Sequence, residues 1–489
     1  MIILPLSFFD FVGESGNVAD YIINKYSYEK IRDNHYFVSN IFGSWAVLNQ
    51  KEFDLLRTDQ PEKNPNLFNY LKNSGIILTA DNQEALLRNI QTRNSFLFNS
   101  VNLHVISPTL RCNQKCTYCH ARAVSMDAKG YNMDEEMAKN TVDFIFQSPS
   151  KIITIEFQGG EPLLAFDSLK LIVDYAKNVN EKRKKLLNFV IQTNFTKMND
   201  EIATFLADND FRIGTSLDGP KDIHDKNRKY LDGSGTYKDV VKWIKILKSQ
   251  YDLPINALPT ITKLSLNHHK EIVDEYKSLG IMQIFSRPLL NTGMNESLWK
   301  SISFTSEEYI HFWKNMLEYI MKLNRSGVNF SEYSATILAK KFLSNNYIGY
   351  TCWGCPCGAA LSQVGYDHEG NIYMCDESRS FGDMFRIGHV SQSYSDVFSS
   401  PDVLSIIDTS SGLSSDYSDS PWYPFVGSCM VSTYSKTGNI TANSSNDQEL
   451  TIKSRMAKYI LEKLVFSEED RWILTAWSSL KDNLGCRGS

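Results

Sequence analysis

The chain has 489 residues and a formal net charge of −5 at pH 7, and a soft prior of roughly 150 residues per domain predicts about three folded units. Hydrophobic residues make up 42% and charged residues 22%, which excludes a disordered or collagen-like chain. The acidic balance gives no general attraction to nucleic acid, and no apolar stretch reaches the roughly 18 residues of a membrane span. We therefore expect a cytoplasmic protein without nucleic-acid or membrane partners.

The first 95 residues are expected to form a separate module. Residues 44–57 (SWAVLNQKEFDLLR) have the pattern of a strand followed by a helix, and residues 67–78 (LFNYLKNSGIIL) that of a second helix and a return strand. This order predicts a small winged-helix-like module.

From about residue 102 to 325, short strand patterns alternate with amphipathic helical patterns. Six such units predict an α/β fold, a parallel sheet curled into a partial (β/α)6 barrel, because each right-handed crossover covers the sheet. The expected strands are 102–107, 151–158, 188–193, 212–217, 256–261 and 283–287. The expected helices are 133–147, 166–184, 199–208, 236–250, 268–279 and 305–324.

The regular alternation stops after about residue 330. A region rich in Cys, Gly and Tyr (350–390) precedes a Ser/Asp-rich stretch (391–420) that is expected to be loop. Helical patterns return at 448–464 and 467–481. The expected domains are 1–95, 96–328, 329–440 and a helical segment at 441–489.

Three cysteines follow the first barrel strand in the segment SPTLRCNQKCTYCHARA, at Cys112, Cys116 and Cys119. One short loop with this spacing can hold three corners of a [4Fe-4S] cluster and leave the fourth iron open. The nine cysteines of the chain are odd in number and clustered, which favours thiolate metal ligation over disulfides. Zinc is the alternative, but it would need a fourth protein ligand, and the adjacent His120 has poor geometry for that role.

The second barrel strand ends in QGGEPLL, with Gly159, Gly160, Glu161 and Pro162. Two glycines at a strand end allow close approach of the backbone and expose carbonyls that an ammonium group can use. Together with the cysteine loop one strand earlier, this segment resembles the radical SAM superfamily over 102–325. The resemblance implies a [4Fe-4S] cluster on the three cysteines and S-adenosylmethionine (SAM) on its open iron, with the methionine amine at the GGEP segment.

The same resemblance implies roles for polar side chains near the strand ends. Tyr118 would pack beside the adenine, and Arg228 would pair with the methionine carboxylate. The ribose and methionine groups would contact side chains from two further strand ends, namely Gln192, Asn194, Ser216 and Asp218. The last three could instead cap the helices that follow.

The spacing of Cys357 and Cys375 resembles the first half of the SPASM extension of peptide-modifying radical SAM enzymes. The resemblance implies one auxiliary [4Fe-4S] cluster, held by Cys357, Cys375, Cys429 and either Cys352 or Cys355. Zinc on the same thiolates is the alternative. An outer auxiliary cluster is not expected, because three of its family cysteine positions are occupied here by Asp416, Asp419 and Phe425.

Asp376 directly follows Cys375, where related maturases place a carboxylate near the substrate. It could act as the base that takes a proton as the substrate radical is oxidised. An exposed aspartate in a turn is the alternative.

The phrases TSLDGPKDIHDKNR (215–228) and RPLL (287–290) resemble the His-Xaa-Ser system radical SAM maturases. This resemblance implies a 5'-deoxyadenosyl radical that abstracts a side-chain hydrogen from a ribosomally made precursor peptide, with a carbon-carbon (cyclophane-type) crosslink as the favoured product. It also implies an electron donor such as flavodoxin or ferredoxin. The first module would then bind the leader sequence as an added strand, unless it is only a structural cap. Thioether-forming, epimerising or sulfatase-maturing enzymes, and a non-catalytic peptide-binding scaffold, are the alternatives.

Overall fold

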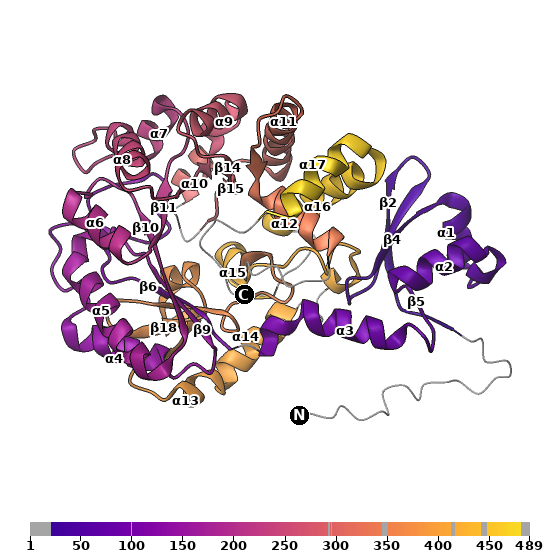
Figure 1. Cartoon of the computed structure of the whole chain (residues 1–489), viewed down its shortest axis with the longest axis horizontal. Helices are drawn as coiled ribbons and strands as arrows, with labels where there is room; N and C mark the ends of the chain where they lie inside the picture. The colour runs from indigo at the N-terminus through magenta and orange to yellow at the C-terminus, as the bar shows by residue number, and fades with distance from the viewer. Residues whose placement is uncertain are drawn as a thin grey trace. The chain divides into compact units, whose positions relative to one another are not determined.

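The computed structural model describes residues 21–98, 100–291, 294, 296–344, 351–411, 416–441 and 447–480. The chain divides into two compact units, 1–89 and 90–489, which are coloured by residue number in Figure 1. The helix α3 (Gln83–Arg93) crosses the boundary between them.

The first unit contains an antiparallel sheet in the order β2–β3–β4, and a separate antiparallel pair of β1 with β5. The predicted order of strand, helix, helix and strand is found as β4, α1, α2 and β5. The strands β1, β2 and β3 come in addition to the predicted elements. The bounds are β1 (Ile22–Ile23), β2 (Ser27–Arg32), β3 (His35–Ser39), β4 (Trp45–Asn49), α1 (Gln50–Arg57), α2 (Pro65–Ser74) and β5 (Ile77–Leu78).

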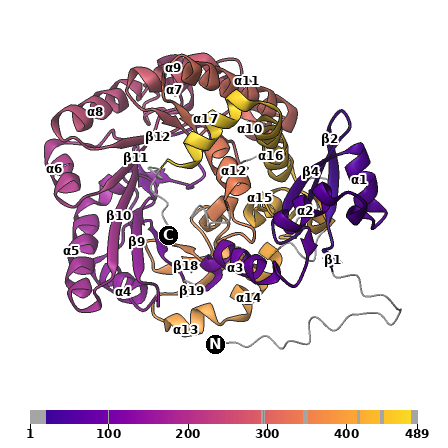
Figure 2. The same cartoon turned by 45° about the vertical axis from the view of Figure 1, so that its right-hand side comes forward.

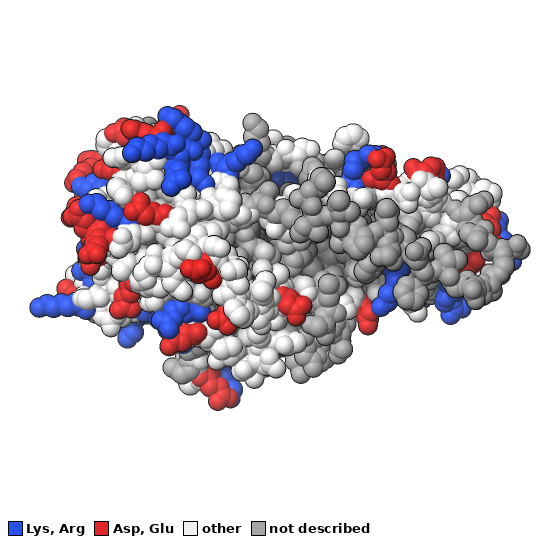
Figure 3. Space-filling model, turned by 90° about the horizontal axis from the view of Figure 1, so that it is seen from below, with Lys and Arg blue, Asp and Glu red and all other residues white. Residues whose placement is uncertain are grey.

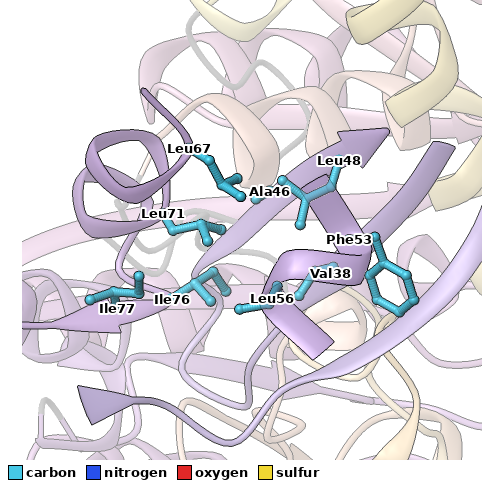
Figure 4. Packing of buried hydrophobic residues seen from close by; sticks show 9 residues of the cluster. All are labelled: Val38, Ala46, Leu48, Phe53, Leu56, Leu67, Leu71, Ile76 and Ile77. Atoms are coloured by element: carbon cyan, nitrogen blue, oxygen red, sulfur yellow. The ribbon is translucent and has the colours of Figure 1, made fainter. Parts of the chain in front are cut away.

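Spacing of apolar residues explains the core of this unit. Leu67 and Leu71 lie four residues apart on α2, so both point to the same side of the helix. The helix α1 begins at a capping box, in which the side chains of Asn49 and Glu52 each accept from the other residue's backbone N–H. Figure 4 shows the buried cluster formed by Val38, Ala46, Leu48, Phe53, Leu56, Leu67, Leu71, Ile76 and Ile77.

The second unit is built on an eight-stranded sheet in the order β12–β11–β10–β9–β6–β17–β18–β19. All six predicted barrel strands are present, and the fifth and sixth are each interrupted into two short strands. The pairs β13–β15 and β14–β16 continue the parallel pattern. The bounds are β6 (Leu103–Ile106), β9 (Ile152–Phe157), β10 (Leu186–Thr193), β11 (Arg212–Ser216), β12 (Ile255–Leu258), β13 (Thr260–Ile261), β14 (Gln283–Ile284), β15 (Arg287–Pro288) and β16 (Ser331–Glu332).

The six predicted barrel helices are also present, within a few residues of the expected ends. Figure 2 shows helices α4 to α6, α8 and α9 in an arc outside the strands, as expected when each crossover covers a parallel sheet. Their bounds are α4 (Glu135–Ile145), α5 (Phe166–Arg183), α6 (Asp200–Asp208), α8 (Tyr237–Gln250), α9 (His269–Ser278) and α11 (Ser306–Arg325). Two further helices are α7 (Lys221–Asn227) and α10 (Glu296–Ile302).

The region after 350 extends the barrel sheet. Strand β17 (Gln363–Tyr366) pairs in parallel with β6, and the antiparallel strands β18 (Asn371–Tyr373) and β19 (Arg386–His389) follow. These strands were not among the predicted elements. Because β17 borders the first barrel strand, it brings the late cysteine segment beside the cysteine loop.

The prediction of loop over 391–420 is wrong for most of that stretch. It contains α13 (Tyr394–Phe398), α14 (Pro401–Ser411) and a short 3₁₀ helix, η8 (Asp416–Asp419). Ser393 caps α13 by accepting from the N–H of Asp396, and Pro401 opens α14. Serine and proline therefore start helices here, and burial of apolar residues such as Val403 and Ile406 stabilises them.

The predicted C-terminal helices are confirmed as α16 (Gln448–Phe466) and α17 (Glu468–Ser478). Both pack against α11 and α12 (Tyr333–Leu343) of the same unit. None of the described helices is both long and apolar enough to span a bilayer. On the face in Figure 3, acidic and basic side chains are interspersed.

Candidate functional site

A cavity of about 210 Å³ lies at the carboxyl ends of the barrel strands, where parallel barrels gather their chemistry. Its lining includes Cys112, Cys116 and Cys119 from the loop after β6. Residues that follow β9, β10 and β11 complete the wall. Of the other residues predicted from sequence, the cavity is lined by Tyr118, Gly159, Gly160, Glu161, Gln192, Asn194, Ser216, Arg228, Cys352 and Asp376.

The cysteine loop is fixed by backbone hydrogen bonds to the segment after α7. The N–H of Lys115 donates to the carbonyl of Lys229 at 2.8 Å, and the N–H of Thr117 donates to that of Asn227 at 2.9 Å. These bonds hold the loop open toward the cavity without using the thiols.

Two of the thiol sulfurs lie near nitrogen donors that would stabilise a thiolate. The N–H of Gln114 lies 3.4 Å from Cys112 Sγ, and a guanidinium nitrogen of Arg228 lies 3.8 Å from Cys116 Sγ. Burial raises the pKa of both thiols, that of Cys116 to about 11, so they stay protonated unless a cation binds. Among the described residues no three His, Cys, Asp or Glu side chains converge on a point where they could hold one metal ion. A cubane does not need such convergence, because each of its thiolates binds a different iron. The donor set fits a [4Fe-4S] cluster.

The two glycines of the GGEP segment are required by the cysteine loop itself. A Cβ at Gly159, where φ is 135°, would lie 2.3 Å from the carbonyl oxygen of Thr109, and one at Gly160 would lie 2.2 Å from that of Arg111. The N–H of Gly160 donates to Thr109 at 3.0 Å. The close approach that the two glycines permit is therefore to the backbone of Thr109 and Arg111. This contact holds the GGEP segment against the start of the cysteine loop.

Glu161 anchors this segment to the next strand. Its carboxylate accepts from Thr193 Oγ1 at 2.6 Å and from the N–H of Asn194 at 2.8 Å. Burial raises the pKa of Glu161 to about 7. Pro162 then begins a short 3₁₀ helix, η4 (Pro162–Ala165).

Asp218 is fully buried and organises two residues of the wall from behind. It accepts from the hydroxyl of Tyr118 and, at 3.3 Å, from Nε of Arg228. The guanidinium lies over the Tyr118 ring, 5.1 Å from its centroid. Burial alone would lower the pKa of Arg228, but the Asp218 carboxylate outweighs it and raises that pKa, so the guanidinium stays charged beside the cavity.

The alternative that polar residues at strand ends cap the next helices is wrong. Helix α6 is capped by Asn199, and α7 begins after Pro220 with no side-chain cap. Asn194 instead accepts from Thr196, whose hydroxyl lies 2.6 Å away. Its amide nitrogen donates to Oδ1 of Asn113 at 3.2 Å and lies 3.9 Å from Cys112 Sγ. Asn194 and Ser216 both line the cavity.

A second, smaller cavity of about 70 Å³ gathers the late cysteines. Cys352, Cys357, Cys375 and Cys429 line it. The first two come from one short segment, and the other two follow further along the chain. Cys355 lies outside both cavities, with its thiol beside Tyr423. Of the two cysteines that the sequence leaves open, Cys352 therefore lines the cavity with the other late cysteines and Cys355 does not.

Phe425 occupies one of the positions where the family has a cysteine, and it is part of the hydrophobic core. Phe425 is fully buried, and its ring stacks on that of Phe342 with centroids 4.5 Å apart. The residue serves the hydrophobic interior of this region.

Asp376 lines both cavities, as do Arg287, Cys352 and Glu377, so these residues lie where the two cavities approach each other. Its Oδ1 accepts from Nε2 of Gln363 on β17 at 2.7 Å. A Cβ at Gly365 would lie 3.2 Å from the Cα of Asp376, so the glycine makes room for this segment against the sheet. The alternative of an exposed turn does not describe this position.

Sequence reasoning missed three charged residues of the first cavity. Glu156 projects from β9, and burial raises its pKa to about 7. Arg287 and Glu377 form an ion pair at the wall. Glu156 could have been noticed in the sequence as the single charged residue of the strand IITIEF, because buried parallel strands are mostly apolar.

His120 also lines the first cavity, next to the cysteine loop. The residue keeps exposed surface, yet desolvation by the surrounding protein, reinforced by the nearby Arg287, lowers the pKa of His120 to about 4. The imidazole is therefore neutral near pH 7 and adds no charge to the cavity.

The fold and the thiol-lined cavity together define an α/β-barrel enzyme that carries a cysteine-bound cofactor at the barrel mouth. A sequence model described as the radical SAM superfamily matches residues 106–287. An uncharacterized protein of Methanocaldococcus jannaschii is 32% identical, over 46% of this chain and 70% of its own length. The chain belongs to the radical SAM superfamily, whose enzymes use SAM and a [4Fe-4S] cluster.

Further similarities extend beyond the barrel. The Cysteine-type anaerobic sulfatase-maturating enzyme of Clostridium perfringens is 28% identical, over 54% of this chain and 71% of the relative. The structure of native anSMEcpe with bound AdoMet and Cp18Cys peptide superimposes with a TM-score of 0.64 at 21% identity, over 78% of this chain and 99% of that one. Streptococcus suis SuiB bound to precursor peptide SuiA gives 0.51 at 14% identity, over 88% and 99%. These structural likenesses concern the fold.

Proposed function

We propose that this radical SAM enzyme matures a ribosomally made precursor peptide. The observation that carries the proposal is the position of Asp376 between the two thiol-lined cavities. The sulfatase-maturating relative and the peptide complexes of the two structural neighbours support a peptide substrate. The SAM-binding cluster would be held by Cys112, Cys116 and Cys119, and an auxiliary [4Fe-4S] cluster by Cys352, Cys357, Cys375 and Cys429.

The residues around the first cavity have separate tasks in this scheme. Tyr118 and Arg228, held by Asp218, would bind the adenine and the methionine carboxylate, and the GGEP segment would bind the amine. Gln192, Asn194 and Ser216 line the remaining wall and would contact the ribose and methionine groups. Such preorganised contacts keep the reacting atoms close and exclude water.

The chemistry requires the substrate to lose a hydrogen atom and then a proton and an electron. Cys112, Cys116 and Cys119 would hold the cluster that, with SAM bound, would supply the 5'-deoxyadenosyl radical for the hydrogen abstraction, and Cys352, Cys357, Cys375 and Cys429 would hold a cluster able to take up the electron. Asp376 is the base for the proton, oriented by its hydrogen bond from Gln363. We expect flavodoxin or ferredoxin to supply the reducing electrons.

The favoured product is a carbon-carbon crosslink between side chains of the peptide. The second candidate is oxidation of a cysteine in a sulfatase-type target, which the 28% identity to the Clostridium perfringens enzyme favours. Both outcomes use the same hydrogen abstraction and the same base. They differ in whether the substrate keeps its sulfur.

Mass analysis of two peptides separates these candidates. Reduced, anaerobically reconstituted enzyme is incubated with SAM and either a candidate precursor peptide or a cysteine-containing sulfatase peptide. A crosslink removes two hydrogens and leaves every thiol reactive to iodoacetamide, a thioether removes two hydrogens and consumes a thiol, and sulfatase-type oxidation loses sulfur. Epimerisation leaves the mass unchanged. Absence of 5'-deoxyadenosine in all mixtures would favour a non-catalytic scaffold.

We also propose that the first unit is a winged-helix-like module that captures the leader sequence. In the described part of this unit β2 pairs with β3 alone, at the edge of its sheet, and an edge strand can accept a further strand by backbone hydrogen bonding. A chain that begins at Ile90 should turn over the full precursor as slowly as a leaderless peptide. Release of 5'-deoxyadenosine without peptide should persist and serves as the folding control.

A further inference from the structure

The second cavity contains a buried pair of opposite charges that the scheme above does not use. Lys453 and Glu449 lie one turn apart on α16 and both line the cavity. Nζ and Oε1 are 2.6 Å apart, and the two side chains are only 7% and 10% exposed. Removing two charges from water costs free energy that the attraction between them often fails to offset. Stability alone is thus a weak reason for this placement.

Lys453 connects two of the segments that carry cysteines. Its Nζ donates to the carbonyl oxygen of Cys352 at 2.8 Å and to that of Gly427, two residues before Cys429, at 3.4 Å. The ammonium group also lies 5.3 Å from the centroid of the Trp353 ring. One charged side chain therefore fixes the backbone on two sides of the cavity.

Glu449 has a buried atom that lacks a partner. Its Oε2 makes no hydrogen bond in the described part of the chain, although the residue is 92% buried, being 8% exposed. An unpaired buried carboxylate oxygen is costly. Its position on the cavity wall means that whatever fills the cavity experiences this charge.

We propose that the Glu449–Lys453 pair sets the reduction potential of the auxiliary cluster, and that Lys453 also positions the Cys352 and Cys429 segments. The inference rests on the auxiliary cluster proposed above. A cluster becomes more negative when it gains an electron, so Lys453 stabilises the reduced form and Glu449 destabilises it. The two residues act on the potential with opposite sign.

Two variants of the full chain measure this effect. After anaerobic reconstitution, a redox titration followed by electron paramagnetic resonance should give a more negative auxiliary potential for Lys453→Met and a more positive one for Glu449→Gln. Lys453→Arg keeps the charge and should restore a potential near that of the unmodified protein. Lys463→Met is the matched control, because Lys463 is similarly buried on the same helix but pairs with Glu318 and Asp470, away from the cavity.

The outcomes separate this inference from the proposed function. Unchanged potentials, or shifts of the same sign in Lys453→Met and Glu449→Gln, overturn the inference alone if the unmodified protein holds about eight irons per chain. About four irons in the unmodified protein would remove the auxiliary cluster and the inference with it. If Lys453→Met fails to retain iron, the isosteric Glu449→Gln decides, and an unshifted potential there overturns the inference.

Discussion

The two cavities of the second unit gather thiols in different ways. In the first, Cys112, Cys116 and Cys119 come from one short loop that backbone hydrogen bonds fix, and Cys352 from the late segment also reaches the wall. In the second, the thiols come from stretches of chain that are brought together by the pairing of β17 with β6 and by the packing of α16 against α11 and α12. The cluster that a single loop can bind is determined mainly by the spacing of its cysteines. A site assembled from several segments depends on the whole fold, and its surroundings include side chains from helices such as α16.

The sharpest way to break this comparison is to remove one thiol from each cavity. Cys116→Ala should reduce SAM cleavage to the level of a protein-free mixture, because the first cluster loses a ligand. Cys375→Ala should retain cleavage within about tenfold and lose peptide product, as expected when a supporting site is altered. Chromatography of 5'-deoxyadenosine and mass analysis of the peptide measure both. Equal loss of cleavage in the two variants would contradict separate roles.

The next largest effect is expected where the cavities meet. Asp376→Asn keeps the size of the side chain and its contact with Gln363 but removes the base. Product formation should fall by roughly 10²–10⁴-fold, while 5'-deoxyadenosine release stays close to normal. Parallel quantification of the two products tests this, and a parallel fall in both would assign Asp376 a structural role instead.

The contact between the GGEP segment and the cysteine loop gives a third test. Gly160→Ala places a Cβ 2.2 Å from the Arg111 carbonyl oxygen, so it should destabilise the protein by about 1–3 kcal/mol and shift the cluster loop. Gly130→Ala is the control, because no atom lies within 4 Å and only its φ of 82° opposes a side chain. Its cost should be about 1–2 kcal/mol. Thermal unfolding and cluster absorbance report both, and a Gly160→Ala protein with normal absorbance would contradict the close packing.

The last expected effect concerns the carboxyl group of Glu156 in the first cavity. Burial raises the pKa of Glu156 from 4.5 to about 7, so the folded protein holds this proton more tightly than the unfolded chain. The stabilisation is fully present below pH 4.5 and is lost as the pH rises through about 7. Glu156→Gln should reduce this slope by at most about 1.4 kcal/mol per pH unit. Thermal melts across this range measure it, and an identical slope in the variant would show that Glu156 does not titrate there.

Much of the barrel could be predicted because its signals are local. Periodicity located every predicted strand and helix between 102 and 325. The spacing of Cys112 to Cys119 predicts a metal site on one loop, and the three thiols do line one cavity. The serine-rich stretch 391–420 predicts loop, although Ser393 caps a helix there. A serine favours both a turn and a helix start, and only packing decides between them.

The second cavity could be predicted only in part. The sequence indicated the set of late cysteines, but Cys352 and Cys355 are equivalent by spacing, and only the fold separates them. The pairing of β17 with β6 is a contact between residues far apart in the chain, which no local pattern reports. Glu449 and Lys453 resemble an ordinary helix pair until α16 is seen to border the cavity.

Iron quantification with Mössbauer or paramagnetic resonance spectroscopy of anaerobically reconstituted protein tests the central claim most directly. We expect about eight irons per chain as two [4Fe-4S] clusters. A variant with Cys112, Cys116 and Cys119 all changed to Ala should retain about four, held at the second cavity. The account would be contradicted if the triple variant kept the full cubane signal of the unmodified protein. About twelve irons in the unmodified protein would also contradict it.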